Sequence, residues 1–561
     1  MAAKNKHAGD ANKESGDTTT VAAAGGTSVW GDFFVTYTPP PSQRSEEWIR
    51  ERADELKGQV RRMFVAGKAM GIEDTLSFVD TLERLGIDSH FREEIDAALT
   101  SIHSEEGPDL GSFSNDLHFV ALRFCLLRQH GFWVSADVFD RFRDASGDFS
   151  MDLADDPRGL LSLYNAAHMA VPGEAALDEA IAFARRHLEV AKCKVRSPMA
   201  EQVSRALEIP RPRMMRRLEA IHYIAEYEQE EAHNTTLLEL ARLDFNMVRS
   251  LQLKELRDIS LWWRDLYNDV KLPYARHRIV ETYLYTCGVF HEEENSRARM
   301  ILAKAFAFVS LLDDTYDSHA TLEDSKRLTE AMQRLDESMV PVLPEYMRTF
   351  YIKILSNFND IEDTLEPWEK YRMIHIKKMF ELQCEKYFQE AEWSSKNYIP
   401  SFQEHIDVSV VSTSLPLLFL VALMGAGQHA TKEAFDWALG IPDMVLGCAE
   451  TGRFLNDIAS YKQGRKCKMD VASSLECYIK EHGVTVSDAM AAFATKVEHA
   501  WRRINQECMQ LDRGILPAAQ LVVNMTRINV VWYLRGRDAY SSSGSLKDTV
   551  ASLFIKDFPI Y

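Results

Sequence analysis

One stretch organises the chain: Phe308-Val-Ser-Leu-Leu-Asp313-Asp314-Thr-Tyr-Asp317, an apolar run that ends in three carboxylates. Residues 301 to 312 are apolar on nearly every side, and a helix of that composition is buried all round. Buried helices do not usually end in clustered carboxylates, because an unpaired charge is costly to remove from water. The stretch therefore predicts a buried helix with a polar site at its end.

The carboxylates of this stretch are spaced for a cation. Asp313 and Asp317 are four residues apart, so on a helix their side chains share one face. Oxygen ligands on one face suit Mg2+, which takes one or two carboxylates and completes its shell with waters and substrate phosphates. The pattern indicates a metal–phosphate site at the mouth of an apolar pocket, although by itself it is more often the solvated end of a helix.

Composition narrows the class of protein. The chain has 561 residues, 46% hydrophobic and 27% charged, which is ordinary for a soluble globular protein. Its 65 basic and 84 acidic residues leave a net charge of −19, which disfavours nucleic acid and anionic membrane as partners. The eight cysteines show no Cys-x-x-Cys spacing and predict reduced thiols. We expect no helix to span a bilayer, because the strongest candidate, residues 415–427, is too short.

Apolar residues at helical spacing continue through both halves of the chain, as in Leu76, Val79, Leu82 and Leu85. No run alternates with the period of a strand, so the sequence predicts an all-α protein. We divide it into a disordered segment at 1–28, a helical domain at 29–235 and a second helical domain at 236–561. The acidic residues of the first segment are untypical of an organelle transit peptide, so we expect a cytoplasmic protein.

Two arginines precede the acidic stretch. Arg276 and Arg278 follow Pro273, which should end the preceding helix and leave them in a loop or at a helix start. The planar donor fork of arginine suits phosphate oxygens, while an exposed basic turn is the simpler alternative.

Two polar clusters follow the acidic stretch. Asn456 and Ser460 share a helix face, with Arg453 one turn earlier, which suggests a metal and an anion bound together. Thr413 lies in Ser412-Thr-Ser-Leu-Pro416, where Pro416 should kink an apolar helix into a pocket wall, unless a helix simply starts there.

Taken together, these segments resemble the plant class I terpene synthases over nearly the whole chain from Trp30 onward. The matching motifs, in the family's order and spacing, are Trp30-Gly-Asp, Gly159-Leu-Leu-Ser-Leu-Tyr164, Arg276-x-Arg278, Asp313-Asp314-x-x-Asp317, Asn456-Asp457-x-x-Ser460 and Arg537-Asp538-Ala-Tyr540. The resemblance implies two all-α domains: a C-terminal class I catalytic bundle and an N-terminal α-barrel that is a relic of a class II fold.

The resemblance also implies residue roles. Asp313 and Asp317 should bind two of three Mg2+ ions, with Mn2+ as a possible substitute, and Asn456 and Ser460 should hold the third. Asp314 should orient the arginine segment. The diphosphate should be held by Arg276, Arg278 and Arg453. The apolar pocket should be lined by Tyr285, Phe306, Thr413, Tyr533 and Tyr540, with Asp538 orienting Tyr540.

The implied reaction is the Mg2+-dependent ionisation of farnesyl diphosphate, with release of diphosphate and conversion of the carbocation to sesquiterpenes. Such a lyase needs only a small prenyl diphosphate as partner, and we expect a monomer. Three alternatives stay open: a monoterpene synthase on geranyl diphosphate, a chain-elongating prenyl transferase, which would need a second Asp-Asp-x-x-Asp, and an inactive paralogue that serves as a helical interaction module.

Two positions depart from the family pattern. Gly464 stands where the second metal motif usually ends in glutamate, so the third ion loses a carboxylate. We expect weaker metal affinity or an altered metal preference, but not an inactive enzyme. Tyr285 stands where tryptophan is often found, and tyrosine is the weaker π partner for a cation.

Overall fold

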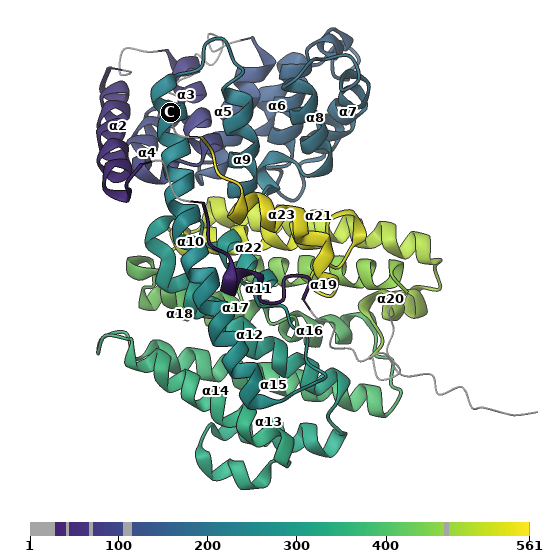
Figure 1. Ribbon diagram of the computed structural model, residues 1–561. Helices are drawn as coiled ribbons and strands as arrows, with labels where there is room; N and C mark the ends of the chain where they lie inside the picture. Colours follow the sequence, from purple (N-terminus) through teal and green to yellow (C-terminus); the bar gives the residue numbers. More distant parts are fainter. Residues whose placement is uncertain (1–27, 41–43, 67–70, 105–114, 465–470, 560–561) are drawn as a thin grey trace, which may run out of the picture.

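The computed structural model describes residues 28–40, 44–66, 71–104, 115–464 and 471–559 (Figure 1). Within these ranges every named element is helical, and the only β pairing is an isolated bridge between Arg143 and Phe149. The prediction of an all-α protein is confirmed. The segment expected to be disordered, apart from Ser28, lies outside the described residues.

Helices from the first part of the chain surround one hydrophobic core, drawn in purple and blue in Figure 1. They are α2 (Glu46–Ala66), α3 (Ile72–Leu85), α4 (Arg92–Ser104), α5 (Leu117–Gln129), α6 (Pro157–Ala167), α7 (Ala175–Ala191), α8 (Met199–Glu208) and α9 (Arg216–Tyr227). The predicted apolar stripe of Leu76, Val79, Leu82 and Leu85 on α3 is fully buried in this core.

The later helices surround a second and larger core. They are α11 (Ile279–Val289), α12 (Ser296–Ser318), α13 (Leu322–Arg334), α14 (Glu345–Asp363), α15 (Arg372–Ser395), α16 (Phe402–Ser412), α17 (Leu415–Gly425), α18 (Lys432–Leu439), α19 (Asp443–Lys462), α20 (Ser474–His482), α21 (Val486–Gln510), α22 (Leu516–Trp532) and α23 (Lys547–Val550). The predicted buried helix is α12, which ends one residue after Asp317.

One long helix, α10 (Thr235–Val270), joins the two cores. Asn234 caps its start by accepting hydrogen bonds from the backbone N–H groups of Thr236 and Leu237. Its first turns bury apolar side chains in the first core, and residues from Leu253 onward bury theirs in the second. The predicted division after residue 235 coincides with the start of this helix, and it stays a prediction.

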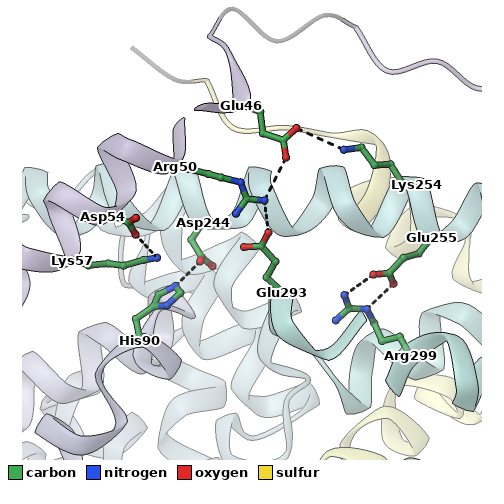
Figure 2. A network of polar contacts seen from close by, with 10 residues as sticks. All are labelled: Glu46, Arg50, Asp54, Lys57, His90, Asp244, Lys254, Glu255, Glu293 and Arg299. Atoms are coloured by element: carbon green, nitrogen blue, oxygen red, sulfur yellow. Dashed lines mark hydrogen bonds and ion pairs between the residues drawn. The ribbon is translucent and has the colours of Figure 1, made fainter. Parts of the chain in front are cut away.

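Ion pairs reinforce the contact between the two parts along α10. Figure 2 shows Arg50 of α2 reaching Glu293, which precedes α12, at 2.6 Å, and His90 bound to Asp244 of α10 at 2.6 Å. Deeper in the molecule, Arg299 of α12 makes two 2.8 Å hydrogen bonds to Glu255 of α10. Both side chains are almost fully buried, and a buried pair with all its partners in place fixes the relation between two helices.

One apolar segment corrects an expectation from the sequence. Among the described residues, Phe402–Gly425 is long and apolar enough, by length and composition, to cross a membrane. However, 89% of its apolar window is buried inside the protein. The segment is also two helices, because Ser414 adopts a left-handed φ of 65° between α16 and α17. It is a core segment, and Pro416 lies in the first turn of α17 rather than at a kink within one helix.

Candidate active site

A cavity of about 1300 Å³ opens in the second part of the molecule. Its lining includes every site residue predicted from the sequence: Arg276, Arg278, Tyr285, Phe306, Asp313, Asp314, Asp317, Thr413, Arg453, Asn456, Ser460, Tyr533, Asp538 and Tyr540. They come from the loop between α10 and α11, from α11, α12 and α19, from the break between α16 and α17, and from the segment that follows α22. The fold therefore brings segments more than 200 residues apart in sequence to one site.

The acidic end of α12 lies against the arginine segment. The backbone N–H of Arg276 donates to Oδ2 of Asp314 at 2.7 Å, and Arg276 Nε lies 2.6 Å from Asp314 Oδ1. Burial raises the pKa of Asp314, which Arg276 partly offsets. Asp314 thus has the contacts that the predicted orienting role requires, and the role itself stays a prediction.

Asp313 faces the cavity and pairs with the same arginine. Arg276 Nη2 donates to Asp313 Oδ2 at 2.6 Å. Burial opposes the charge on Arg276, but Asp314 and Asp313 outweigh it and hold the pKa of this guanidinium well above its usual value. The charge at the cavity mouth is therefore shared between one arginine and two carboxylates before any ligand enters.

On α19, the second polar cluster lines the same cavity. Asn456 Nδ2 donates a hydrogen bond to the hydroxyl of Tyr533 at 3.1 Å. This bond orients the amide so that its oxygen can coordinate a cation. Arg453 Nη2 donates to Ser412 Oγ at 3.3 Å. Asp457 instead accepts hydrogen bonds from the backbone N–H and the hydroxyl of Ser474, so it ties α19 to α20.

The oxygen atoms of these two clusters fit a hard divalent cation. Asp313, Asp317, Asn456 and Ser460 offer only carboxylate, amide and hydroxyl oxygen. In the described part of the chain no three His, Cys, Asp or Glu side chains gather closely enough to enclose a metal by themselves. A cation here would complete its shell with water and ligand phosphate, as Mg2+ commonly does.

Arg278 makes contacts that its predicted role did not foresee. Its Nε donates to the backbone oxygen of Tyr540 at 2.6 Å, and its Nη2 donates to the backbone oxygen of Ser541 at 3.0 Å. In this structure Arg278 holds the segment after α22 against α11. Direct binding of diphosphate by Arg278 stays a prediction.

Aromatic rings gather in the apolar part of the cavity. The Tyr540 ring lies 5.7 Å from Phe306 and 5.1 Å from Trp532, measured between ring centroids, and its hydroxyl donates to Ser310 Oγ at 2.6 Å. Asp538 accepts hydrogen bonds from the backbone N–H groups of Tyr540 and Ser541 at 3.0 Å each, so it shapes the turn that presents Tyr540.

Trp532 and Glu390 are among the cavity residues that were missed from the sequence. Trp532 contacts the Tyr285 and Phe306 rings with centroids 5.0 and 5.7 Å away. Glu390 of α15 accepts a hydrogen bond from Ser412 Oγ at 2.7 Å, and burial raises its pKa to about 7. The one sequence signal for Glu390 is its spacing. It lies three residues after Tyr387, and both side chains are on the buried face of α15.

Gly464 lies just beyond the last residue of α19, with a left-handed φ of 64°. Its N–H donates to the backbone oxygen of Tyr461 at 3.1 Å, and a Cβ added here would meet nothing within 4 Å. The position ends the helix and borders the cavity, so the missing glutamate is replaced by a helix-terminating residue. Residues 465–470, which follow Gly464 and include the basic residues Arg465, Lys466 and Lys468, lie outside the described residues.

Comparison with known proteins gives consistent matches along the chain. Residues 29–207 match the family model "Terpene synthase, N-terminal domain", and residues 264–503 match "Terpene synthase family, metal binding domain". A eudesmanediol synthase of Zea mays is 57% identical over 532 residues, covering 94% of this chain and 95% of the relative. A probable sesquiterpene synthase of Santalum murrayanum is 39% identical, covering 94% of both chains.

A solved structure is similar over most of its length. Isoprene synthase from grey poplar (Populus x canescens), in complex with three Mg2+ ions and dimethylallyl-S-thiolodiphosphate, superimposes with a TM-score of 0.84 at 31% identity. The match covers 91% of this chain and 97% of that one.

Proposed function

Because the chain belongs to the terpene synthase family, we propose that it ionises farnesyl diphosphate, releases diphosphate and converts the carbocation to sesquiterpenes. One observation carries the proposal: the oxygen-bearing ends of α12 and α19 line the same cavity as two arginines and a group of aromatic rings. The probable sesquiterpene synthase of Santalum murrayanum supports the fifteen-carbon substrate.

A divalent cation belongs to the metal-binding domain of this family. We propose three Mg2+ ions, with Mn2+ as an acceptable substitute, held by Asp313 and Asp317 on one side and Asn456 and Ser460 on the other. The complex of the poplar enzyme with three Mg2+ ions supports this number. When bound, the cations supply charge neutralisation on the leaving diphosphate.

Arginine side chains of the protein bind the diphosphate itself. Arg276 and Arg453 present charged donor forks to the diphosphate oxygens, and such charge-assisted bonds strengthen as negative charge develops on the leaving group. The pair of Arg276 with Asp313 is exchanged for the diphosphate as the site fills. Asp314 keeps Arg276 in place because it binds the backbone N–H as well as the side chain.

The apolar part of the cavity shelters the carbocation. The faces of Phe306, Trp532 and Tyr540 lie within 6 Å of one another and offer negative π density to a positive carbon. An apolar wall limits the entry of bulk water, which would otherwise react at once with the cation. The reaction ends when a proton leaves to the released diphosphate. The maize relative is named for a diol, so we propose that water also ends a share of the reactions here.

Product analysis tests the function. Purified protein with Mg2+ is incubated with farnesyl diphosphate and, separately, with geranyl diphosphate, and volatile products and diphosphate release are measured. We expect faster turnover of farnesyl diphosphate, whereas a preference for geranyl diphosphate would make the protein a monoterpene synthase. Asp313→Ala should abolish turnover, and Asp265→Ala, a change at an exposed carboxylate outside the cavity, should not. A wild-type protein without turnover would favour the inactive helical interaction module.

The cytoplasmic location and the monomeric state are proposals as well, to be tested by fractionation and by size in solution.

A further inference from the structure

Tyr285 has an unusual position for a phenol. It lies in α11, is fully buried and lines the cavity next to the Phe306 and Trp532 rings, whose centroids are 5.2 and 5.0 Å from its own. Among the described residues its hydroxyl has no hydrogen-bond partner. A buried hydroxyl left without a partner costs about 1–3 kcal/mol, so a partner from outside the chain is favoured.

Water is the partner that the surroundings suit. A water molecule in a protein needs room and more than one polar contact. The cavity gives room beside the Tyr285 side chain, whose hydroxyl oxygen is itself buried. Further polar groups lie near the phenol. Burial raises the pKa of Tyr285 well above its usual value, and Cys448 and Tyr533 are near enough to add to this effect. Asn529 donates to Cys448 Sγ at 3.7 Å and also lines the cavity.

We propose that the Tyr285 hydroxyl holds a water molecule in the apolar part of the cavity, and that this water adds to the carbocation to form an alcohol. The inference rests on the proposed function and assigns one residue to the choice between alcohol and hydrocarbon products. Tyr285 acts as a positioning residue, because it contacts the water rather than the reacting carbon.

The step balances without an additional reagent. A lone pair on the water oxygen forms the new C–O bond to the cationic carbon. The resulting oxonium loses a proton to the diphosphate released by ionisation, so prenyl diphosphate and water give alcohol and diphosphate. The phenol oxygen accepts a hydrogen bond from the water, which leaves a lone pair free for the carbon. The Phe306 and Trp532 faces keep the positive charge beside this water.

Tyr285→Phe tests the assignment, because it removes the hydroxyl and keeps the ring. Wild-type protein and variant are incubated with farnesyl diphosphate and Mg2+ in water enriched in oxygen-18. We expect labelled alcohols from the wild type, and a fall of about fivefold or more in the alcohol fraction of Tyr285→Phe, measured relative to the diphosphate that each protein releases. Tyr351→Phe is the matched control, since this buried tyrosine of α14 bonds to the backbone oxygen of Ala331 outside the cavity.

The possible results distinguish a failure of the proposed function from a failure of the role assigned to Tyr285. Absence of diphosphate release by the wild type from any prenyl diphosphate overturns the proposed function. Turnover by the wild type to unlabelled hydrocarbons alone overturns only the role of Tyr285. An unchanged alcohol fraction in Tyr285→Phe also overturns it. If Tyr285→Phe does not fold, judged by its circular dichroism, Tyr285→Trp replaces it under the same criteria, because that change also removes the phenol.

Discussion

Arg276 and Asp313 are joined by a 2.6 Å ion pair at the mouth of the cavity. One is the arginine expected to hold diphosphate, and the other is the carboxylate expected to hold metal. Before ligands bind, each therefore serves as the counter-ion of the other. The pair keeps two charged side chains in place while the cavity is open, and it can be exchanged for metal and diphosphate because Asp313 is about one-third exposed.

This relationship predicts the effect of Asp313→Asn. Arg276 keeps Asp314 as a partner, so the variant should fold and melt close to the wild type. It loses a charged metal ligand, however, so kcat/KM should fall about 100-fold or more, and the Mg2+ concentration for half-maximal turnover should rise. Steady-state kinetics across a Mg2+ titration measure both. Asp265→Asn is the control, and a metal dependence like that of the wild type in Asp313→Asn would contradict the assignment.

The left-handed backbone at Gly464 makes a glutamate at this position costly for stability. With φ at 64°, any side chain costs about 1–2 kcal/mol of strain. We predict that Gly464→Glu lowers the Mg2+ concentration for half-maximal turnover severalfold while lowering the melting temperature. Gly464→Ala carries the same strain without the carboxylate, and so it isolates the charge. Equal Mg2+ dependence in the two variants would show that the carboxylate does not reach the site.

The course of α12 could be predicted because its composition and the spacing of Asp313 and Asp317 are local properties. A buried apolar run must be covered, and its charged end must face a polar space. The partners of that end do not follow from composition or periodicity, since the contact between Asp314 and the backbone of Arg276 joins residues 38 positions apart, and only the family resemblance indicated it. Periodicity identifies the buried face of a helix, but not the element that covers it.

Other features of the site were missed for the same reason: the pattern of a sequence does not show which distant element a side chain contacts. Arg278 lines the cavity, and its diphosphate role stays a prediction, but its bonds to backbone oxygens of a segment more than 260 positions later were not foreseen. Trp532 was indistinguishable from an ordinary core residue, because a ring that lines a cavity and one that fills a core have the same helical spacing. The left-handed Ser414 ends α16 outright, which proline content alone does not indicate.

Glu281 predicts a dependence of stability on pH. It lies in the first turn of α11, fully buried, with both carboxyl oxygens lacking a hydrogen-bond partner among the described residues. Burial raises its pKa from 4.5 to about 7, against the opposing effect of Arg278. Between these values the folded protein binds a proton that the unfolded chain has lost. The free energy of unfolding should therefore fall as pH rises from about 4.5 to about 7.

Glu281→Gln should reduce this slope without removing it, because a neutral amide does not titrate whereas Glu390, whose pKa burial also raises to about 7, still does. Urea unfolding at a series of pH values measures it. The exposed Glu330→Gln on α13 is the matched control and should keep the slope of the wild type. If Glu281→Gln and the wild type lose stability in parallel over this range, another group is responsible.

Asn246 links the end of the chain to the joining helix α10. Its Nδ2 donates to the backbone oxygen of Phe558 at 2.7 Å, and its Oδ1 accepts from the Phe558 N–H at 3.1 Å. The Phe558 ring packs against Phe245 with centroids 5.1 Å apart, so Phe558 is bound to α10 through both its backbone and its ring. Because both bonds are partly shielded from water, Asn246→Ala should lower the free energy of unfolding by about 1–3 kcal/mol.

Thermal and urea unfolding of Asn246→Ala measure this loss. Asn359→Ala, an exposed change on α14, corrects for the replacement of asparagine by alanine in a helix. Removal of residues 556–561 should cost more than Asn246→Ala, since it also removes the ring of Phe558 from its contact with Phe245. Turnover should survive both changes at low temperature, because Asn246 does not line the cavity. If truncation left stability unchanged, the contact would be incidental, and the other links between the two parts would be enough to hold them together, such as the bonds from Asn505 to the backbone oxygens of His168 and Ala170.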